Sequence, residues 1–233
     1  MDLAIFSADG SYMLLRWFHY IFGVIWIGHL YYFNFTQGPF FAETDASTKS
    51  NAIQKLLPRA LWWFRWGAMF TFITGLLMLK LKAMQSGWEV FGTSWGINIL
   101  VGSLFATVMF LNVWLIIWPN QKIVIANAEG TAKGQPANPA AAGAGARALL
   151  ASRTNVLFSF PMLFFMGTAS HLPIGVSENS QAMLLYGILG LIIVGLEVNI
   201  FKGKLGPLTT VKGVIHSAIG FTVLTYALLE VLI

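Results

Sequence analysis

The chain has 233 residues, of which 57% are hydrophobic and only 10% are charged. Soluble domains carry about 25% charged residues, so this composition excludes a water-soluble globule, and 15% aromatic residues exclude a disordered chain. The absence of cysteine excludes disulfides, iron–sulfur clusters, thiolate zinc sites and covalently attached c-type haem. The net charge of +5 does not indicate nucleic-acid binding, because the basic residues lie in loops between long apolar runs.

Six apolar segments are long enough, or nearly so, to cross a bilayer, which takes about 20 residues. In chain order they are residues 12–35, 61–79, 97–118, 156–170, 183–200 and 214–233. The fourth is short and contains Pro161, so it either extends backward through 144–155 or is kinked at the proline. The Gly-, Ala- and Pro-rich stretch 130–145 predicts a flexible cytoplasmic loop. We therefore expect an all-α integral membrane protein, a six-helix transmembrane bundle forming one domain over residues 1–233.

The distribution of charge predicts the orientation of this bundle. Six spans place both termini on one side of the membrane. Of the 14 Lys and Arg residues, 11 lie in loops and span ends on the opposite side, and Arg16, Lys80 and Lys82 lie on the side of the termini. The positive-inside rule makes the basic side cytoplasmic. We expect a multi-pass protein of the bacterial inner membrane with both termini in the periplasm.

All four histidines lie within or at the edge of the apolar spans, where ionisable residues are costly and mark functional sites. His19 and His171 fall at the periplasmic level, and His29 and His216 fall at the cytoplasmic level. Two levels of paired imidazoles predict one or two b-type haems with histidine ligands to the iron. Structural histidines, another metal or a proton relay are the alternatives.

Glycines lie three or four residues from three of these histidines, where the edge of a macrocycle fits. They are Gly23 near His19, Gly167 near His171, and Gly213 and Gly220 near His216. His29 has only bulky neighbours at these offsets and is the weakest ligand candidate. The pair His19 and His171 ranks first, although small residues in membrane helices also serve helix packing.

A second group of polar residues gathers near the cytoplasmic ends of the spans. Its members are Asn34, Gln37, Arg65, Asn112, Asn120, Gln121, Arg153, Asn155, Glu197 and Asn199. Glu197 lies in an apolar run and needs a partner, and Arg65 and Arg153 lie at a compatible depth. A guanidinium also binds a haem propionate or a planar anionic substrate in two-point contact. The candidate catalytic residues are Arg153, Asn120, Gln121 and Glu197, and Arg65 is a candidate cofactor-binding residue. Each alone could instead be an interfacial or capping residue.

Five stretches resemble a known family. They are WFHYIFGVIWIGHLYYFNFTQ (17–37), LWWFRWGAMFTFITGLL (61–77), FLNVWLIIWPNQKIVI (110–125), ASRTNVLFSFPMLFFMGTASHLP (151–173) and KGVIHSAIGF (212–221). They resemble the membrane domain of the bacterial membrane-bound urate hydroxylases, the urate oxidases that carry a C-terminal cytochrome c domain. The resemblance covers most of the chain, and its most specific parts are WPNQK and SRTN…PMLFFM…ASH.

The resemblance implies oxidation of urate towards 5-hydroxyisourate, with electrons leaving to cytochrome c. With the histidines, this predicts a membrane-bound oxidoreductase that passes electrons through b-type haem; the resemblance itself gives no catalytic residues. The chain stops at Ile233 without cysteine, so we expect a separate cytochrome c or other redox partner. The alternatives are a b-haem electron-transfer subunit or a haem-free accessory subunit of a larger membrane complex. The expected partners are therefore the lipid bilayer, a redox protein and possible further subunits, without nucleic acid.

Overall fold

The structure is a computed structural model that describes residues 3–233. Over this range it is built from helices, and six helical segments are long and apolar enough to cross a membrane. They are Ala8–Glu43, Leu57–Ser86, Ser94–Ala132, Ala141–His171, Ala182–Lys202 and Val211–Leu232. Each predicted span overlaps one of them, which confirms the all-α class and the number of long apolar helices.

Two of these segments change their helical pitch midway. The first consists of α1 (Ala8–Tyr31), a π-helical turn (Tyr32–Gln37) and α2 (Gly38–Glu43). The third consists of α5 (Ser94–Leu111), a π-helical turn (Asn112–Ile117) and α6 (Trp118–Ala132). Pro39 and Pro119 each lie two residues after the end of one of these turns. Proline lacks an N–H and clashes with the carbonyl four residues earlier, so a local widening keeps each helix continuous.

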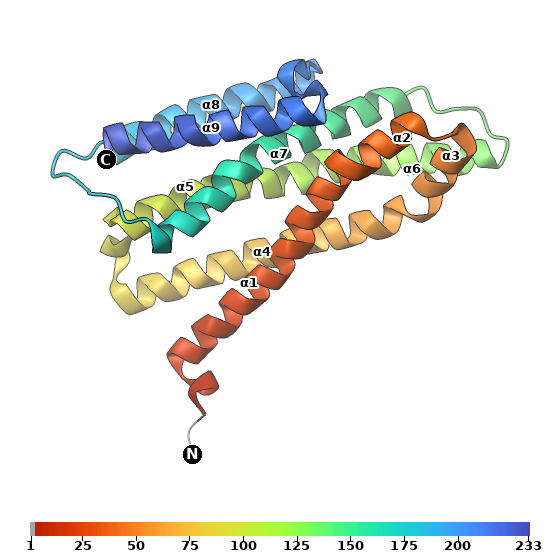
Figure 1. Ribbon diagram of the computed structural model, residues 1–233. Helices are drawn as coiled ribbons and strands as arrows, with labels where there is room; N and C mark the ends of the chain where they lie inside the picture. Colours follow the sequence, from red (N-terminus) through yellow and green to blue (C-terminus); the bar gives the residue numbers. More distant parts are fainter. Residues whose placement is uncertain (1–2) are drawn as a thin grey trace.

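Helix α7 (Ala141–His171) occupies the centre of the bundle (Figure 1). It packs against α5, α6 and α9 (Val211–Leu232), and it also contacts α1 and α8 (Ala182–Lys202). Every residue from Leu150 to Ser159 is buried. Pro161 lies inside the helix without ending it. Of the two expectations for the fourth span, the structure therefore has the backward extension.

The remaining helices flank α7 on two sides. Helix α1 packs against α4 (Leu57–Ser86), and α8 and α9 lie side by side. Helices α2 and α3 (Ala46–Lys55) lie at one end of the bundle, and the C-terminus lies at the other (Figure 1). Residues 133–140 join α6 to α7, so the stretch 130–145 that we expected to be a loop is helical at both ends.

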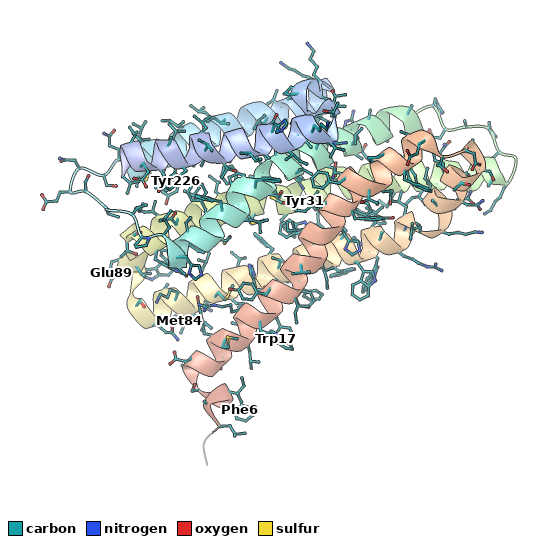
Figure 2. The ribbon with its side chains drawn as sticks, viewed as in Figure 1. Phe6, Trp17, Tyr31, Met84, Glu89 and Tyr226 are labelled. Carbon is teal, nitrogen blue, oxygen red and sulfur yellow. The ribbon has the colours of Figure 1, made fainter. Side chains whose placement is uncertain are left out.

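Apolar side chains cover the outside of the bundle as well as its core. The core contains large buried rings, such as those of Trp26, Phe105 and Phe158. Trp17 and Met84 project from the outer faces (Figure 2), with 47% and 72% of their surface exposed. Long helices that are apolar on the outside as well as the inside are typical of multi-pass membrane proteins.

Candidate functional site

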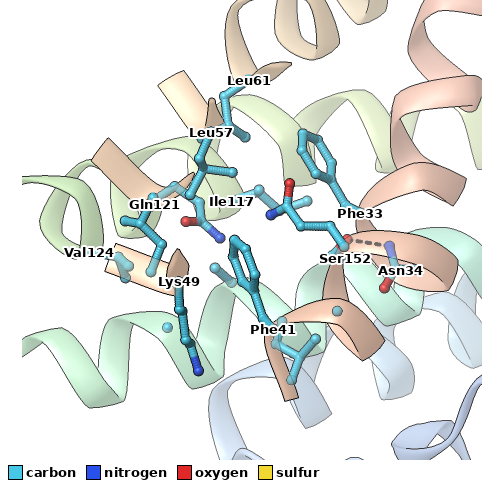
Figure 3. Close-up of a pocket in the computed structure, with 16 residues that line it drawn as sticks. Phe33, Asn34, Phe41, Lys49, Leu57, Leu61, Ile117, Gln121, Val124 and Ser152 are labelled. Atoms are coloured by element: carbon cyan, nitrogen blue, oxygen red, sulfur yellow. Dashed lines mark hydrogen bonds between the residues drawn. The ribbon is translucent and has the colours of Figure 1, made fainter. Parts of the chain in front are cut away.

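A cavity of about 320 Å³ lies where the first π-helical turn meets α2, α3, α4, α6 and α7. We call it the amide cavity, after the amide side chains in its wall. Its polar lining residues are Asn34, Gln37, Lys49, Gln121 and Ser152. Figure 3 shows these elements contributing side chains to one common space.

Three amide oxygens in this wall are without a hydrogen-bond partner in the part of the chain that the structure describes. Asn34 donates from Nδ2 to the Leu30 carbonyl (2.8 Å) and to Ser152 Oγ (2.7 Å), which leaves its Oδ1 free. Gln37 Oε1 and Gln121 Oε1 are also buried and free. An unpaired buried polar group costs about 1–3 kcal/mol. Because these side chains line the cavity, a ligand with N–H donors would recover this cost once the amide oxygens turn toward it.

Charge and aromatic rings complete the wall of the amide cavity. Lys49 brings an ammonium from α3, with its Nζ 6.0 Å from the centre of the Phe41 ring. Phe33 and Phe41 both line the cavity. Aromatic rings bind flat apolar faces, amides bind polar edges, and a cation neutralises negative charge. Together they suit a planar anionic heterocycle with N–H groups.

Arg153 is the exception in the buried stretch of α7. Its polar neighbours Ser152, Thr154, Asn155 and Ser159 all form hydrogen bonds. Arg153 is only 6% exposed, yet its Nε and Nη1 find no partner within residues 3–233. A buried guanidinium in this condition is a site where an anion would be strongly stabilised.

Glu197 has an amide partner where we expected an arginine. Asn112 Nδ2 donates to Glu197 Oε1 (2.8 Å) and to Asn155 Oδ1 (2.9 Å). Asn155 in turn donates to the Met109 carbonyl (3.0 Å). This network ties α5, α7 and α8 together in the core. Its geometry assigns Glu197 to helix packing rather than to the amide cavity.

The other predicted polar residues point elsewhere. The Arg65 guanidinium lies over the Trp118 ring, 3.8 Å from its centre, in a cation–π contact. Asn120 donates back to the Ile116 carbonyl of its own helix (2.7 Å). Among the candidate catalytic residues, Gln121 alone belongs to the described lining of the amide cavity, where Asn34 and Gln37 join it.

His19 lines a separate cavity of about 510 Å³ between α1, α4 and α7, with an almost wholly apolar wall. We call it the histidine cavity. His19 Nδ1 lies 3.1 Å from Thr74 Oγ1. Gly23 and Trp26 on α1 and Met166 on α7 also line this cavity.

His29 lines a cavity of about 550 Å³ between α1 and α4, and its Nδ1 lies 2.7 Å from the Ile25 carbonyl oxygen. His171 and His216 have exposed side chains. Neither belongs to the described lining of the cavities at His19 and His29. Across residues 3–233, no group of three or more His, Asp or Glu side chains is placed to hold a metal ion.

The comparisons with known proteins add a family to this geometry. The family described as Urate oxidase N-terminal matches residues 84–223, which is more than half of the chain. The chain belongs to this family. No curated protein and no solved structure matched.

The match places the Urate oxidase N-terminal region on helices α5 to α9 and the end of α4. It includes Gln121 and Ser152 of the amide cavity, and also Arg153 outside its lining, but not Asn34 and Gln37, which the first π-helical turn brings to that cavity. The urate-related part of the resemblance is thus confirmed. From the sequence, Asn34, Gln37 and Gln121 could be identified only as polar residues at one depth in the membrane. That their amide oxygens are unpaired could be seen only in the structure.

Proposed function

We propose that this Urate oxidase N-terminal protein is a membrane-bound oxidoreductase that binds urate in the amide cavity, oxidises it and delivers electrons to a cytochrome c. The observation that carries the proposal is the set of three buried, unpaired amide oxygens on residues that line the same cavity as Lys49. Urate is planar, carries N–H groups along its edges and is an anion at neutral pH. The amide oxygens accept hydrogen bonds from these N–H groups. Lys49 balances the negative charge of urate, and Phe33 and Phe41 contact the ring faces.

The reaction balances as a two-electron oxidation. Urate takes up one water molecule, forms a C–O bond at C5, and loses two electrons and two protons to give 5-hydroxyisourate. Two molecules of oxidised cytochrome c each accept one electron. The amide cavity binds and orients urate for this step. The cavity lies at the end of the bundle with α2 and α3, which we assign to the cytoplasm of a bacterial inner membrane, with both termini periplasmic.

A b-type haem would supply one-electron transfer between urate and the cytochrome. The residues around His19 fit such a group, because this histidine lines an apolar cavity of about 510 Å³. Trp26 lines the same cavity, and its buried Nε1 is unpaired among the described residues. That N–H is a donor for a propionate. The cavity at His29 offers room for a second haem.

Urate binding to variants of the amide cavity tests the proposal. Gln121→Leu and Gln37→Leu each remove an amide while keeping much of the side-chain volume. Losing a hydrogen bond of about 1–3 kcal/mol weakens urate binding roughly 5- to 150-fold. Calorimetric titration of the protein in lipid nanodiscs measures the dissociation constant. The same samples, mixed with urate and oxidised cytochrome c, report turnover.

Gln54→Leu is the matched control, because Gln54 lies on α3 and bonds to Ser50 outside the cavity lining. It should bind urate as the unaltered protein does. The proposal fails if the unaltered protein does not bind urate, or if both cavity variants bind it with unchanged affinity.

A second function is supported by the separation of the two cavities. The histidine cavity shares no lining residue with the amide cavity in the described chain. A b-haem electron-transfer subunit of a larger complex needs only the histidine cavity. In that case haem is present and reducible by a partner, while urate neither binds nor reduces the protein.

A further inference from the structure

The hydrogen bonds around His19 fix which ring nitrogen carries its proton. Thr74 Oγ1 has one hydrogen, which it donates to the carbonyls of Phe70 (2.7 Å) and Thr71 (3.0 Å). The short bond to the Phe70 carbonyl favours Thr74 as the acceptor at its contact with His19 Nδ1. Neutral His19 then carries its proton on Nδ1 and a free lone pair on Nε2. A metal-binding histidine is oriented in this same way by a partner on its other nitrogen.

A methionine lines the same cavities as His19. Three cavities have His19 in their lining, of about 510, 50 and 50 Å³, and Met166 lines all three. Met162, one helical turn earlier on α7, lines two of them. His171 lines none of these three. A thioether sulfur is a soft ligand that can bind haem iron opposite a histidine.

The size and wall of this space favour a large apolar group over a bare ion. A single copper ion would leave most of about 510 Å³ empty, whereas a porphyrin fills space of this kind. The wall contains Gly23 and Gly28, which have no side chains to fill the cavity on the α1 side. Gly75 on α4 leaves room for the His19 ring on α1, because a Cβ at Gly75 would lie 3.2 Å from His19 Cε1. The imidazole thus packs against α4 at Thr74 and Gly75.

We propose that His19, through Nε2, and Met166, through Sδ, would hold the iron of a haem between α1, α4 and α7. The inference rests on the haem of the proposed function and assigns its ligands to this chain. It replaces His171, which is exposed at the end of α7, with a methionine on the same helix. Methionine ligation gives a higher reduction potential than ligation by two histidines.

Optical and redox spectroscopy of the purified full-length protein tests the ligand pair. The unaltered protein should show low-spin haem with the sulfur-to-iron charge-transfer band in its oxidised form. Met166→Leu should keep haem, lose that band and become high-spin. Met166→His should restore the low-spin spectrum with a lower reduction potential than the unaltered protein.

Thr74→Val provides a milder probe of His19 than removal of the imidazole. It keeps the volume and deletes the acceptor for Nδ1–H, so the ligand becomes less basic and the reduction potential should rise. Met183→Leu is the control, because Met183 is on α8 and 84% exposed. Its spectrum and potential should match the unaltered protein.

The ligand pair would be overturned by the absence of haem from the folded unaltered protein or by copper in place of iron in elemental analysis. It would also be overturned by an unchanged charge-transfer band in Met166→Leu, or by loss of that band in Met162→Leu alone. Loss of haem in His171→Gln would return the second ligand to that histidine. Urate affinity measured on the same samples keeps the two proposals apart. A protein without haem that still binds urate refutes the ligands and leaves the amide cavity standing.

Discussion

Arg153 shows how a single residue can signal a ligand. Its side chain is 94% covered, yet two of its guanidinium nitrogens have no acceptor in the described chain. Every other polar side chain between Leu150 and Ser159 is hydrogen-bonded, so the stretch is otherwise complete. A buried charge without a partner destabilises the free protein, and a bound anion would remove that penalty.

Arg153→Met should therefore separate stability from binding. The apolar side chain removes unpaired charged donors, so we expect the free energy of unfolding without urate to stay equal or to rise by about 1–3 kcal/mol. The stabilisation that urate gives the unaltered protein should be kept, because Arg153 lies outside the described lining of the amide cavity. Thermal unfolding in nanodiscs, with and without saturating urate, measures both effects.

Arg147→Met serves as the control on the same helix, because Arg147 is exposed. It should unfold at the temperature of the unaltered protein and keep the urate effect. Strong destabilisation by Arg153→Met in the absence of urate would show that Arg153 has a partner in the protein and would contradict this interpretation.

The polar residues also show which part of a site can be predicted from sequence. Their spacing along apolar spans gives their depth, and the predicted level was sufficient to group Asn34, Gln37 and Gln121. Depth does not give rotation about the helix axis, which decides the neighbour. Arg65 therefore lies over Trp118, and Glu197 meets Asn112, although both share the predicted level.

At the scale of elements, prolines decide how the amide cavity is built. Pro39 and Pro119 each follow a π-helical turn, and these turns carry Asn34, Gln37 and Ile117 into the cavity wall. Apolar periodicity locates the helices but contains no signal for an extra residue in one turn. The extension of α7 back to Ala141 was open for a similar reason, because its first turns consist mainly of alanine and glycine, which give no strong apolar periodicity.

The stability of helix α3, which forms part of the wall of the amide cavity, depends on pH through its capping residue. Asp45 caps α3 by accepting hydrogen bonds from the backbone N–H groups of Ser47 (2.9 Å) and Thr48 (3.0 Å) and from the Thr48 hydroxyl. The Thr48 hydroxyl and backbone N–H hold the pKa of the Asp45 carboxyl below its ordinary value. Stabilisation by this cap is complete above the ordinary aspartate pKa and is lost as pH falls through the lowered value.

We expect acid to loosen α3, which supplies Lys49 to the amide cavity. Hydrogen exchange of the 45–55 peptide, corrected for the chemical exchange rate, should accelerate below the ordinary aspartate pKa. Asp45→Asn retains an acceptor without a titrating carboxyl and should lack this acid-dependent change. Equal pH profiles for the two proteins would rule out the cap as the cause.

For the whole molecule, the sequence predicted the number of long helices better than it predicted which helices pack against each other. Long apolar runs set the number of helices, because each must be about 20 residues long to cross a bilayer. Helix α7 at the centre was not predictable from its composition, since its Ser, Arg, Thr and Asn residues resemble a polar flank. They are buried because the fold hydrogen-bonds all of them except Arg153.

The natural absence of cysteine makes the proposed membrane topology directly testable. Single cysteines at Ser47 and Ala137 should lie on the cytoplasmic side, in α3 and in the α6–α7 connection. Single cysteines at Glu89 and Glu178 should lie on the periplasmic side, in the α4–α5 and α7–α8 connections.

A membrane-impermeant maleimide applied to intact bacterial cells should label the Glu89→Cys and Glu178→Cys proteins. It should label Ser47→Cys and Ala137→Cys only after the inner membrane is made permeable. The opposite pattern would invert the bundle and place the amide cavity on the periplasmic side, away from urate made in the cytoplasm. Labelling of all four in intact cells would contradict a six-span topology, because connections at opposite ends of crossing helices cannot share one compartment.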